Sequence, residues 1–290
     1  MSSYQANLIF DNTKAAVDIF FHRNGEFKLS MPKDLLLLHS QTCNSIVIDF
    51  NMDIDWSILI LEHIVRELKR FGYVNFTLLT NYLPFGRANK PESELGCTYA
   101  ILDTFLIQLR KIGIRKVMTR DIHSMNFCFQ PQISIDSDSF VCCMGKHIDK
   151  IMAEHGKNAK YLFISPDTGS LSRAREALHA AREKVKGIFF GKDISFIKQR
   201  TKTCLKIKFR EPEILENENY HNRICIIVDD MVDSGKTIKA AINKVRLLKP
   251  KKIYVLATHC LNEYVKFDDD VTFIYEFGER HESRGVQWQG

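Results

Sequence analysis

Short apolar runs alternate with segments of helical period along most of the chain. Strands are predicted for the apolar runs at residues 45–50, 76–80, 116–120, 161–165, 187–190, 224–228, 252–258 and 271–275. Helices are predicted where apolar residues recur every three to four positions, at residues 56–71, 94–112, 172–184 and 238–248. Strands and helices that alternate in this way are typical of parallel sheets covered by helices. The pattern therefore predicts an α/β fold.

The alternation falls into two successive sets, with a change near residues 141–144. We therefore expect two similar domains, residues 1–143 and residues 144–290, each a mainly parallel sheet flanked by helices. The acidic, asparagine-rich stretch 211–222 is predicted to be an exposed loop.

Composition is that of a soluble globular protein. The 290 residues are 45% hydrophobic and 26% charged, and the net charge is +6. Lysine and arginine are spread along the chain, so we expect no nucleic-acid partner, and a basic balance suits phosphorylated ligands. The eight cysteines lack metal-ligand spacing and are predicted to be reduced. No apolar run reaches membrane-spanning length and the N-terminus lacks the form of a signal peptide, so we expect a cytoplasmic protein without a membrane partner.

The chemistry centres on the end of the predicted strand 224–228. Asp229 and Asp230 follow this strand, and a loop of small residues then opens a helix. Such a loop directs backbone N–H groups and a helix N-terminus at an anion. The two carboxylates cannot bind that anion, but they suit vicinal hydroxyls or a metal ion. The pattern predicts a site for a phosphorylated sugar.

The ending Ser234-Gly235-Lys236-Thr237 invites comparison with a P-loop, but that motif needs a glycine where Asp230 stands. Residues 229–237 instead resemble the ribose-phosphate loop of the type I phosphoribosyltransferase fold, except at Lys236, where that family has a small residue. The resemblance implies that Asp229 and Asp230 hold the ribose 2- and 3-hydroxyls. The residues implied for the 5-phosphate are Asp233, Ser234, Gly235, Lys236 and Thr237. The alternative is an ordinary strand–turn–helix with an acidic turn.

Four further segments, residues 81–90, 120–124, 165–174 and 257–259, resemble motifs of the ribose-phosphate diphosphokinases, or phosphoribosyl pyrophosphate synthetases. The matches run in family order from about residue 20 to about residue 260. The resemblance implies two tandem phosphoribosyltransferase-like domains, with ATP motifs in the N-terminal domain and the sugar-phosphate loop in the C-terminal one. The family transfers the β,γ-diphosphoryl group of ATP to the anomeric hydroxyl of ribose 5-phosphate, which yields phosphoribosyl pyrophosphate and AMP.

The resemblance also implies an ATP–magnesium site. His123 and Asp167 match family residues that hold Mg²⁺ on ATP. Magnesium prefers oxygen ligands, so Asp167 is the better candidate, and His123 has the alternative of a strand-end histidine bonded to the backbone. Arg87 matches an ATP-binding arginine, whereas Ala88 and Asn89 replace the glutamine and aspartate of the family.

Residues 22–26 fit the spacing of a family element that reaches the adenine of a neighbouring subunit. This match implies ATP contacts by His22, Asn24 and Glu26, and hence a homo-oligomer, either a dimer or a hexamer. The same stretch contains Asn24-Gly25 between apolar flanks, which predicts a hairpin turn. Both interpretations can hold together.

The catalytic loop of the family has a Lys-x-Arg pattern just after a strand that corresponds to residues 187–190. Lys192 fits the lysine, but Ile194 stands in place of the arginine. A second pair, Lys198 and Arg200, follows within a few residues. We predict Lys192 as the catalytic cation with Arg200 as its helper. A solvated basic loop without a catalytic role is the alternative.

The departures from the family leave other functions open. Lys236 adds a cation to the phosphate cradle, which would suit an acceptor with a second phosphate, such as ADP-ribose, and a role in NAD-related metabolism. The missing arginine at Ile194 favours a catalytically silent relative that binds phosphoribosyl ligands and regulates a partner. The loop at Asp229 alone would also fit a phosphoribosyltransferase that consumes the activated sugar, but the ATP motifs argue against it.

Overall fold

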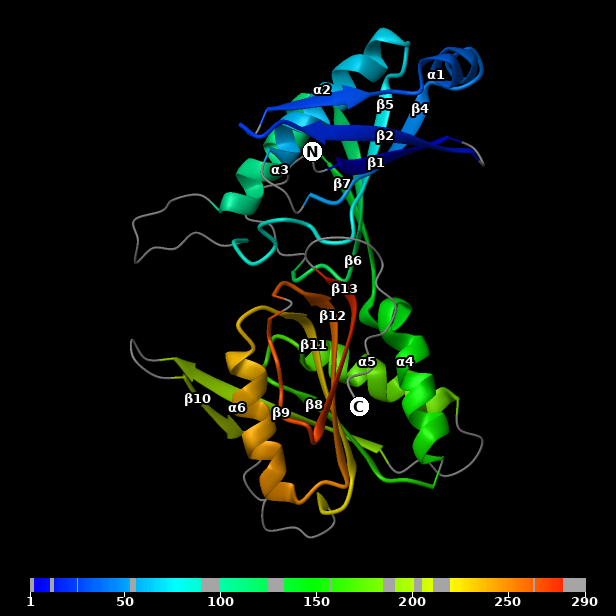
Figure 1. Ribbon diagram of the computed structural model, residues 1–290. Helices are drawn as coiled ribbons and strands as arrows, with labels where there is room; N and C mark the ends of the chain where they lie inside the picture. The colour runs from blue at the N-terminus through cyan, green and yellow to red at the C-terminus, as the bar shows by residue number, and fades with distance from the viewer. Residues whose placement is uncertain are drawn as a thin grey trace. The chain divides into compact units, whose positions relative to one another are not determined.

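The computed structural model describes residues 3–10, 13–24, 26–52, 56–89, 100–124, 133–156, 158–184, 191–200, 205–210, 220–262 and 264–278. The chain divides into two compact units, Met1–Asp138 (unit 1) and Ser139–Gly290 (unit 2), as Figure 1 shows. The division comes before the expected boundary after residue 143. Residue 143 lies within helix α4 (Phe140–His155), and the hydroxyl of Ser139 caps that helix by accepting a hydrogen bond from the Cys142 N–H at 3.3 Å.

Unit 1 is a seven-stranded sheet in the order β3-β2-β1-β4-β5-β6-β7. The strands β4 to β7 are parallel, whereas β1, β2 and β3 pair antiparallel with their neighbours. The elements in chain order are β1 (Ser3–Phe10), β2 (Thr13–Phe21), β3 (Phe27–Ser30), α1 (Lys33–Ser40), β4 (Ser45–Asp49), α2 (Ser57–Arg70), β5 (Asn75–Leu79), α3 (Ile101–Ile112), β6 (Ile114–Arg120) and β7 (Ser134–Asp138).

The core of unit 1 lies on one face of its sheet. Side chains alternate between buried and partly exposed along β4 and β5, so that Ile46, Ile48, Phe76 and Leu78 all join the core. Helix α2 buries a stripe of apolar residues at helical spacing against that face. Only one face of this sheet is buried, and strands with alternating apolar and polar residues suit such a sheet.

Unit 2 is a six-stranded sheet in the order β10-β9-β8-β11-β12-β13, and only β10 is antiparallel to its neighbour. Its elements in chain order are α4, β8 (Tyr161–Ser165), α5 (Leu171–Glu183), β9 (Gly191–Arg200), β10 (Leu205–Phe209), β11 (Ile224–Val232), α6 (Lys236–Val245), the short 3₁₀ helix η4 (Arg246–Leu248), β12 (Lys252–Cys260) and β13 (Val271–Gly278).

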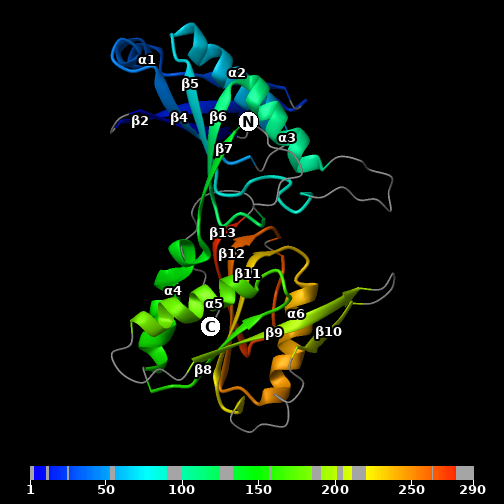
Figure 2. The same ribbon diagram turned by 180° about the vertical axis from the view of Figure 1, so that it is seen from behind.

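The central strands of unit 2 are buried on both faces. All five residues of β8 are buried, and so are the first five of β11, because α4 and α5 cover one face of the sheet while α6 covers the other (Figure 2). Continuous apolar runs such as Ile224–Val228 suit this environment. Unit 2 is therefore a three-layered α/β/α sandwich.

The expected α/β class, with large sheets rich in parallel strands and flanked by helices, is confirmed. Some predicted elements differ in extent. Helix α3 begins at Ile101 rather than residue 94, since Ala100 has an extended backbone (ψ 137°). The strand predicted at 187–190 lies outside the described residues, and β9 pairs with β8 from Gly191 onward. Within the described ranges, no helix is long and apolar enough to cross a membrane.

Candidate functional site

The acidic pair lies at the carboxyl end of β11, where the sequence predicts it. Strand β11 runs parallel to β8 and β12, so their carboxyl ends meet at one edge of the sheet. Asp230 is 3% exposed. The Ser170 hydroxyl donates a short hydrogen bond to Asp229 Oδ1, and the Asp230 N–H donates to the same oxygen at 3.0 Å. These two donors fix the orientation of the Asp229 carboxylate.

The electrostatics of this pair favour a ligand that brings donors or positive charge. Burial raises the pKa of Asp229 well above its ordinary value, and the negative charges of Asp230 and Asp167 raise it further, against the opposing hydrogen bond from Ser170. An ionised Asp229 is thus costly in the free protein. Sugar hydroxyls that donate to it, or a metal cation beside it, would relieve that cost.

Gly235 shapes the turn that leads into α6. Its φ of +68° is in the left-handed region, and a Cβ on it would lie only 2.7 Å from Val265 Cγ1. Among the residues that the structure describes, no side chain caps the first turn of α6, which begins at Lys236. The first N–H groups of this helix therefore point at an anion-binding position. Asp233, Ser234 and Lys236 are exposed, and Thr237 is partly buried.

Asp167 is held in the loop that follows the neighbouring strand β8. Its Oδ1 accepts a hydrogen bond from the Gly169 N–H at 2.9 Å, and the Ser165 hydroxyl donates a short hydrogen bond to its carbonyl oxygen. The charge of Asp167 reaches Asp229. The structure thus brings together the carboxylate predicted for magnesium and the pair predicted for the sugar.

The backbone of β9 argues against Lys192 as the residue of the catalytic loop. Lys192 pairs with Leu162, three residues before the last residue of β8, and Ser195 pairs with Ser165. At about 3.3 Å per residue, Lys192 lies roughly 10 Å back from the edge that carries the loops.

The stretch just after the paired part of β9 contains Lys198 and Arg200, which lie in a hairpin with β10, opposite Ile207 and Leu205. This pair fits the Lys-x-Arg pattern without a missing arginine. The prediction of Lys192 follows from the strand expected at residues 187–190, which lie outside the described residues.

The residues predicted to reach a neighbouring ATP form the turn between β2 and β3 in unit 1. The His22 N–H donates to the Glu26 carbonyl at 2.8 Å, and the Asn24 side chain accepts from the Glu26 N–H at 3.3 Å. The predicted hairpin is confirmed. His22, Asn24 and Glu26 are exposed, so they are accessible to a ligand or to another subunit.

The other predicted ATP residues of unit 1 come from two adjoining segments. A Cβ on Gly86 would lie 3.7 Å from His123 Cβ, which places residues 81–89 beside residues 120–124. Arg87 and His123 are exposed, whereas Asn89 is 6% exposed. Ala88 is one of the two residues that depart from the family motif, and its carbonyl accepts a hydrogen bond from the Leu102 N–H at 3.2 Å, at the start of α3. The side chain of Asn89 is thus largely inaccessible in this chain.

Magnesium would need ligands from outside the protein. In the described part of the chain, no three His, Cys, Asp or Glu side chains come close enough together to hold a metal ion. Magnesium in nucleotide enzymes is commonly bound by one or two carboxylates together with substrate phosphates and water. The carboxylate of Asp167, an oxygen donor beside Asp229, fits that pattern.

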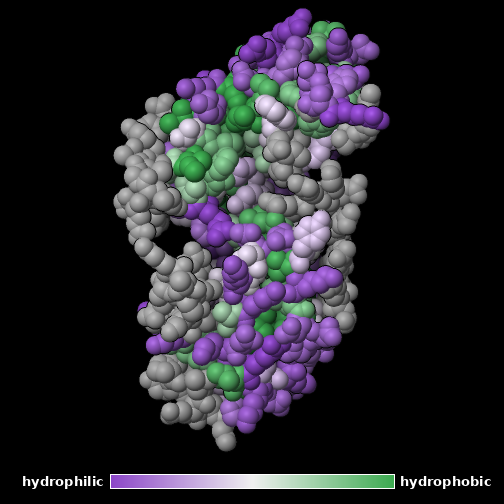
Figure 3. All heavy atoms as spheres, turned by 60° about the vertical axis from the view of Figure 1, so that its left-hand side comes forward, coloured by the Kyte–Doolittle hydropathy of each residue, from purple (hydrophilic) through white to green (hydrophobic). Residues whose placement is uncertain are grey.

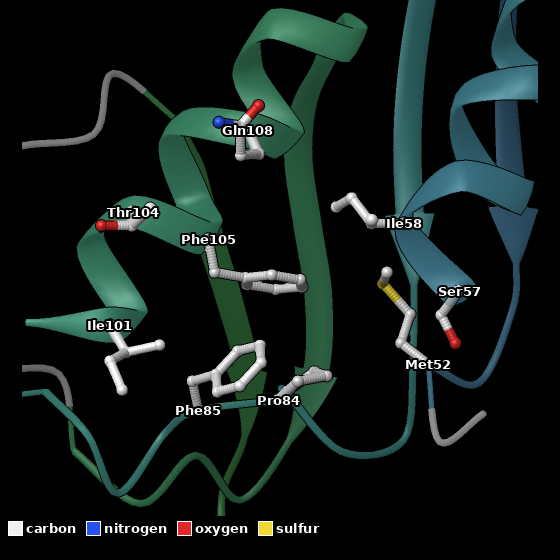
Figure 4. Close-up of a pocket in the computed structure, with 9 residues that line it drawn as sticks. All are labelled: Met52, Ser57, Ile58, Pro84, Phe85, Ile101, Thr104, Phe105 and Gln108. Carbon is white, nitrogen blue, oxygen red and sulfur yellow. The ribbon is translucent and has the colours of Figure 1, made fainter. Parts of the chain in front are cut away.

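Unit 1 contains an apolar cavity that the sequence did not predict. It has a volume of about 370 Å³ and lies between α2, α3 and the loops after β4 and β5. Its lining residues are Met52, Ser57, Ile58, Pro84, Phe85, Ile101, Thr104, Phe105 and Gln108 (Figure 4). The Phe85 and Phe105 rings pack at 5.3 Å between centroids, and Phe85 has a left-handed φ of 64°.

Among the residues that the structure describes, no charged side chain and none of the predicted ATP residues lines this cavity. Exposed apolar residues of the two helices that border it include Leu59 of α2 and Ile101 of α3, and hydrophobic side chains gather in the upper part of Figure 3, which shows unit 1. The described lining thus offers no charged group to a sugar phosphate.

Comparison with known proteins finds a similarity of unit 2 to phosphoribosyl transferase domains. Residues 144–281 match the family model of the phosphoribosyl transferase domain. A ribose-phosphate pyrophosphokinase of Ureaplasma parvum is 26% identical over 197 residues, which cover 68% of this chain and 54% of that protein. Ribose-phosphate pyrophosphokinase B of Dictyostelium discoideum is 23% identical over 229 residues, 77% of this chain and 64% of that protein. The chain thus spans between about half and two thirds of the length of these relatives.

A solved structure resembles the chain in both units. The crystal structure of phosphoribosylpyrophosphate synthetase from Mycobacterium smegmatis matches with a TM-score of 0.61 and 16% sequence identity, over 89% of this chain and 85% of that chain. This likeness, together with the family model, confirms the phosphoribosyltransferase-like fold expected from the motifs.

Proposed function

We propose that this chain, which is related to the ribose-phosphate pyrophosphokinases, transfers the β,γ-diphosphoryl group of ATP to the anomeric 1-hydroxyl of ribose 5-phosphate, forming phosphoribosyl pyrophosphate and AMP. The observation that carries the proposal is the juxtaposition of the Asp229-Asp230 pair, the uncapped N-terminus of α6 and Asp167 at one edge of the unit 2 sheet. This arrangement supplies acceptors for a sugar diol, donors for its 5-phosphate and a carboxylate for magnesium.

In the proposed reaction, the 1-oxygen of the sugar forms a bond to the β-phosphorus of ATP as the bond from that phosphorus to the α-phosphate oxygen breaks. The proton of the 1-hydroxyl is released and AMP leaves. Asp229 and Asp230 would hold the 2- and 3-hydroxyls, and the backbone from Asp233 to Thr237 would hold the 5-phosphate. Orienting the acceptor in this way accounts for much of the catalysis in phosphoryl transfer.

Magnesium, when bound, would neutralise negative charge that develops on the transferred group. Asp167 is the residue of unit 2 that we assign to it, and His123 of unit 1 stays a second candidate. The cationic residues of β9 near its pairing with β10 complete the proposed catalytic residues. We replace Lys192 by Lys198 as the catalytic lysine and keep Arg200 as its partner, since both follow the part of β9 that pairs with β8.

The ATP side of the proposal rests on unit 1. Arg87 would contact ATP, with His22, Asn24 and Glu26 reaching the adenine of a neighbouring subunit, which requires a homo-oligomer. Asn89 is a weaker candidate for ATP contact because it is buried. We place the reaction in nucleotide biosynthesis in the cytoplasm.

ADP-ribose is a second candidate acceptor, and one observation favours it. Lys236 is exposed at the first position of α6, where its ammonium group is able to reach a second phosphate attached to the 5-phosphate. The product would be ADP-ribose pyrophosphate, which would place the enzyme in NAD-related metabolism.

The test is AMP release from Mg-ATP by the purified chain, with ribose 5-phosphate and ADP-ribose as parallel acceptors and phosphorus NMR of the products. AMP release with a new diphosphate on the anomeric oxygen is the expected result. Release with ADP-ribose alone would select the second candidate. Silence with both acceptors would contradict the transfer and favour a regulatory protein that binds phosphoribosyl ligands.

A further inference from the structure

The turn that follows β12 packs directly on the sugar-phosphate loop. Val265 Cγ1 occupies the space beside Gly235, and two ring atoms of Phe267 lie within 3.8 Å of the position that a Gly235 Cβ would take. The Nζ atom of Lys239, on the first turns of α6, lies 6.0 Å from the centre of the Phe267 ring. Val265 and Phe267 therefore form one wall of the loop assigned to the 5-phosphate.

Tyr264 directly precedes Val265 in this turn. Its side chain is 81% exposed, the highest fraction among the large hydrophobic side chains that the structure describes. Its backbone is held in place, because its N–H donates to the Asn262 side chain at 3.0 Å and the Val265 N–H donates to the Asn262 carbonyl at 3.1 Å. The side chain that contacts Gly235 is that of Val265, the next residue, and the Cα atoms of consecutive residues are about 3.8 Å apart.

The charges around Tyr264 suit an anionic ligand. Lys236, Lys239 and Lys266 are all exposed on α6 and on this turn. The acidic residues that follow are partly neutralised, since the Arg246 guanidinium bonds to Asp268 at 2.6 Å and to Asp270 at 2.5 Å. Among the described residues of this turn, Asp269 is the remaining exposed carboxylate.

We infer that Tyr264 is a specificity-determining residue, which stacks on a nucleobase that the acceptor carries beyond its 5-phosphate. The inference rests on the second candidate of the proposed function, in which the acceptor is a ribosyl phosphate extended by a second phosphate and a nucleoside. A phenol ring offers a flat face to a base, and exposed aromatic side chains on fixed backbones are commonly used in this way. Lys236 is placed to meet the second phosphate, and Tyr264 the base beyond it.

The test compares two acceptors in three variants of the full chain. Base–aromatic stacking contributes roughly 10-fold or more to binding, so Tyr264→Ala should lower the ratio of kcat/KM for ADP-ribose to kcat/KM for ribose 5-phosphate by about 10-fold. The loss should lie in KM, and Tyr264→Phe should restore the ratio because it keeps the ring. Leu38→Ala, another exposed apolar side chain on α1 of unit 1, is the matched control and should leave the ratio as in the unsubstituted chain.

A ratio that stays constant in Tyr264→Ala, or a loss that is equal for both acceptors, would overturn the inference while the proposed transfer stands. Lack of ADP-ribose binding by the unsubstituted chain in calorimetry would overturn it as well. If the chain releases no AMP with either acceptor, the proposed function fails. Calorimetric binding of the two acceptors then tests the stacking role of Tyr264 by itself. Weaker ADP-ribose binding by Tyr264→Ala, with ribose 5-phosphate binding less affected, would still support the stacking role.

Discussion

The two units place very different chemistry at the same point of their folds. In each unit, parallel strands end in loops at one edge of the sheet, which is the usual ligand position in such folds. In unit 2 the last part of β11 carries the Asp229-Asp230 pair, and the loop after it leads to an uncapped helix N-terminus. In unit 1 the loops after β4 and β5 line an apolar cavity with Met52, Pro84 and Phe85. One architecture thus supports a polar, charged site and an apolar hollow.

The difference shows that a few residues near the ends of the strands determine which ligand the edge of the sheet suits. The last part of β11 carries two carboxylates and a glycine turn follows it, whereas the loop after β5 contains Asn81-Tyr82-Leu83-Pro84-Phe85. The sheets differ as well, since the central strands of unit 2 are buried on both faces and β4 and β5 of unit 1 on one. Sugar-phosphate binding is therefore expected in unit 2 alone.

The largest expected effect is that of Asp229→Asn. Hydrogen bonds to a charged group contribute about 1.5–3 kcal/mol each, so loss of this acceptor should lower kcat/KM for the sugar phosphate by about 100-fold. The same change should raise the thermal stability of the free protein. Burial raises the pKa of Asp229, so its ionised form destabilises the fold at neutral pH, and asparagine removes that charge.

Thermal unfolding checks the predicted gain of stability in Asp229→Asn, and AMP release checks the predicted loss of activity. An increase of about 1 kcal/mol corresponds to roughly 2–4 °C in Tm for a chain of this size class. Asp269→Asn, at an exposed carboxylate, is the control and should change neither quantity. Loss of stability in Asp229→Asn would show that this carboxylate supports the fold instead of straining it.

The next largest effect is expected from Gly235→Ala. Alanine there takes on the left-handed conformation, which costs about 1–2 kcal/mol, and its Cβ also collides with Val265 at 2.7 Å. Activity should fall, since the loop must shift. Gly72→Ala in unit 1 is the matched control, because Gly72 also has a positive φ (96°) but no atom within 4 Å of a Cβ. Gly72→Ala should destabilise without affecting the KM for the sugar phosphate, and Val265→Ala should partly rescue Gly235→Ala.

The sequence was sufficient for the acidic pair because the signals there are local. A continuous apolar run, two carboxylates and a small-residue turn all fall within residues 224–237. The cavity of unit 1 was not predictable in the same way, because its lining comes from three separate segments that meet only in the folded chain. The contact between Val265 and Gly235 was missed for the same reason.

The apolar residues at 187–190 predict a strand that ends before Lys192, whereas the described register of β9 with β8 runs from Gly191 to Ser195 and places Lys192 within a strand. Strands β1 and β2 were missed although β2 has a period-two pattern of buried positions, with Ala15, Val17 and Ile19 in the core. A search for alternation alone would have found β2.

A moderate effect is expected from acid, and it should fall on unit 2. Burial lowers the pKa of His147, whose Nε2 lies 2.9 Å from a Glu276 carboxylate oxygen, and burial also lowers the pKa of His155. The unfolded chain then binds more protons than the folded one as the pH falls through about 6.5, so stability decreases in that range. Hydrogen exchange at pH 7.5 and pH 5.5 should show faster opening of α4 than of α2.

His147→Gln sharpens this prediction, because glutamine keeps a donor toward Glu276 but does not titrate. The variant should lose less stability between pH 7.5 and 5.5 than the unsubstituted chain. An unchanged pH dependence would assign the acid effect to groups other than His147.

The smallest effect is expected from Ile101→Glu at the mouth of the unit 1 cavity. Ile101 is 56% exposed, so the change should alter the free energy of unfolding by about 0.5 kcal/mol or less. Leu38→Glu, at a side chain that is 68% exposed on α1, is its matched control. Neither variant should change the KM for ribose 5-phosphate. A marked rise of KM in Ile101→Glu alone would place the sugar phosphate in unit 1 and break the contrast between the units.

The most direct measurement is hydrogen exchange of the whole chain with and without ribose 5-phosphate, read by mass spectrometry for each unit. The account predicts protection at the end of β11, in the turn to α6 and in the loop after β8, and loss of that protection in Asp229→Asn. Protection confined to the segments around the unit 1 cavity, or protection in unit 2 that survives in Asp229→Asn, would contradict the central claim.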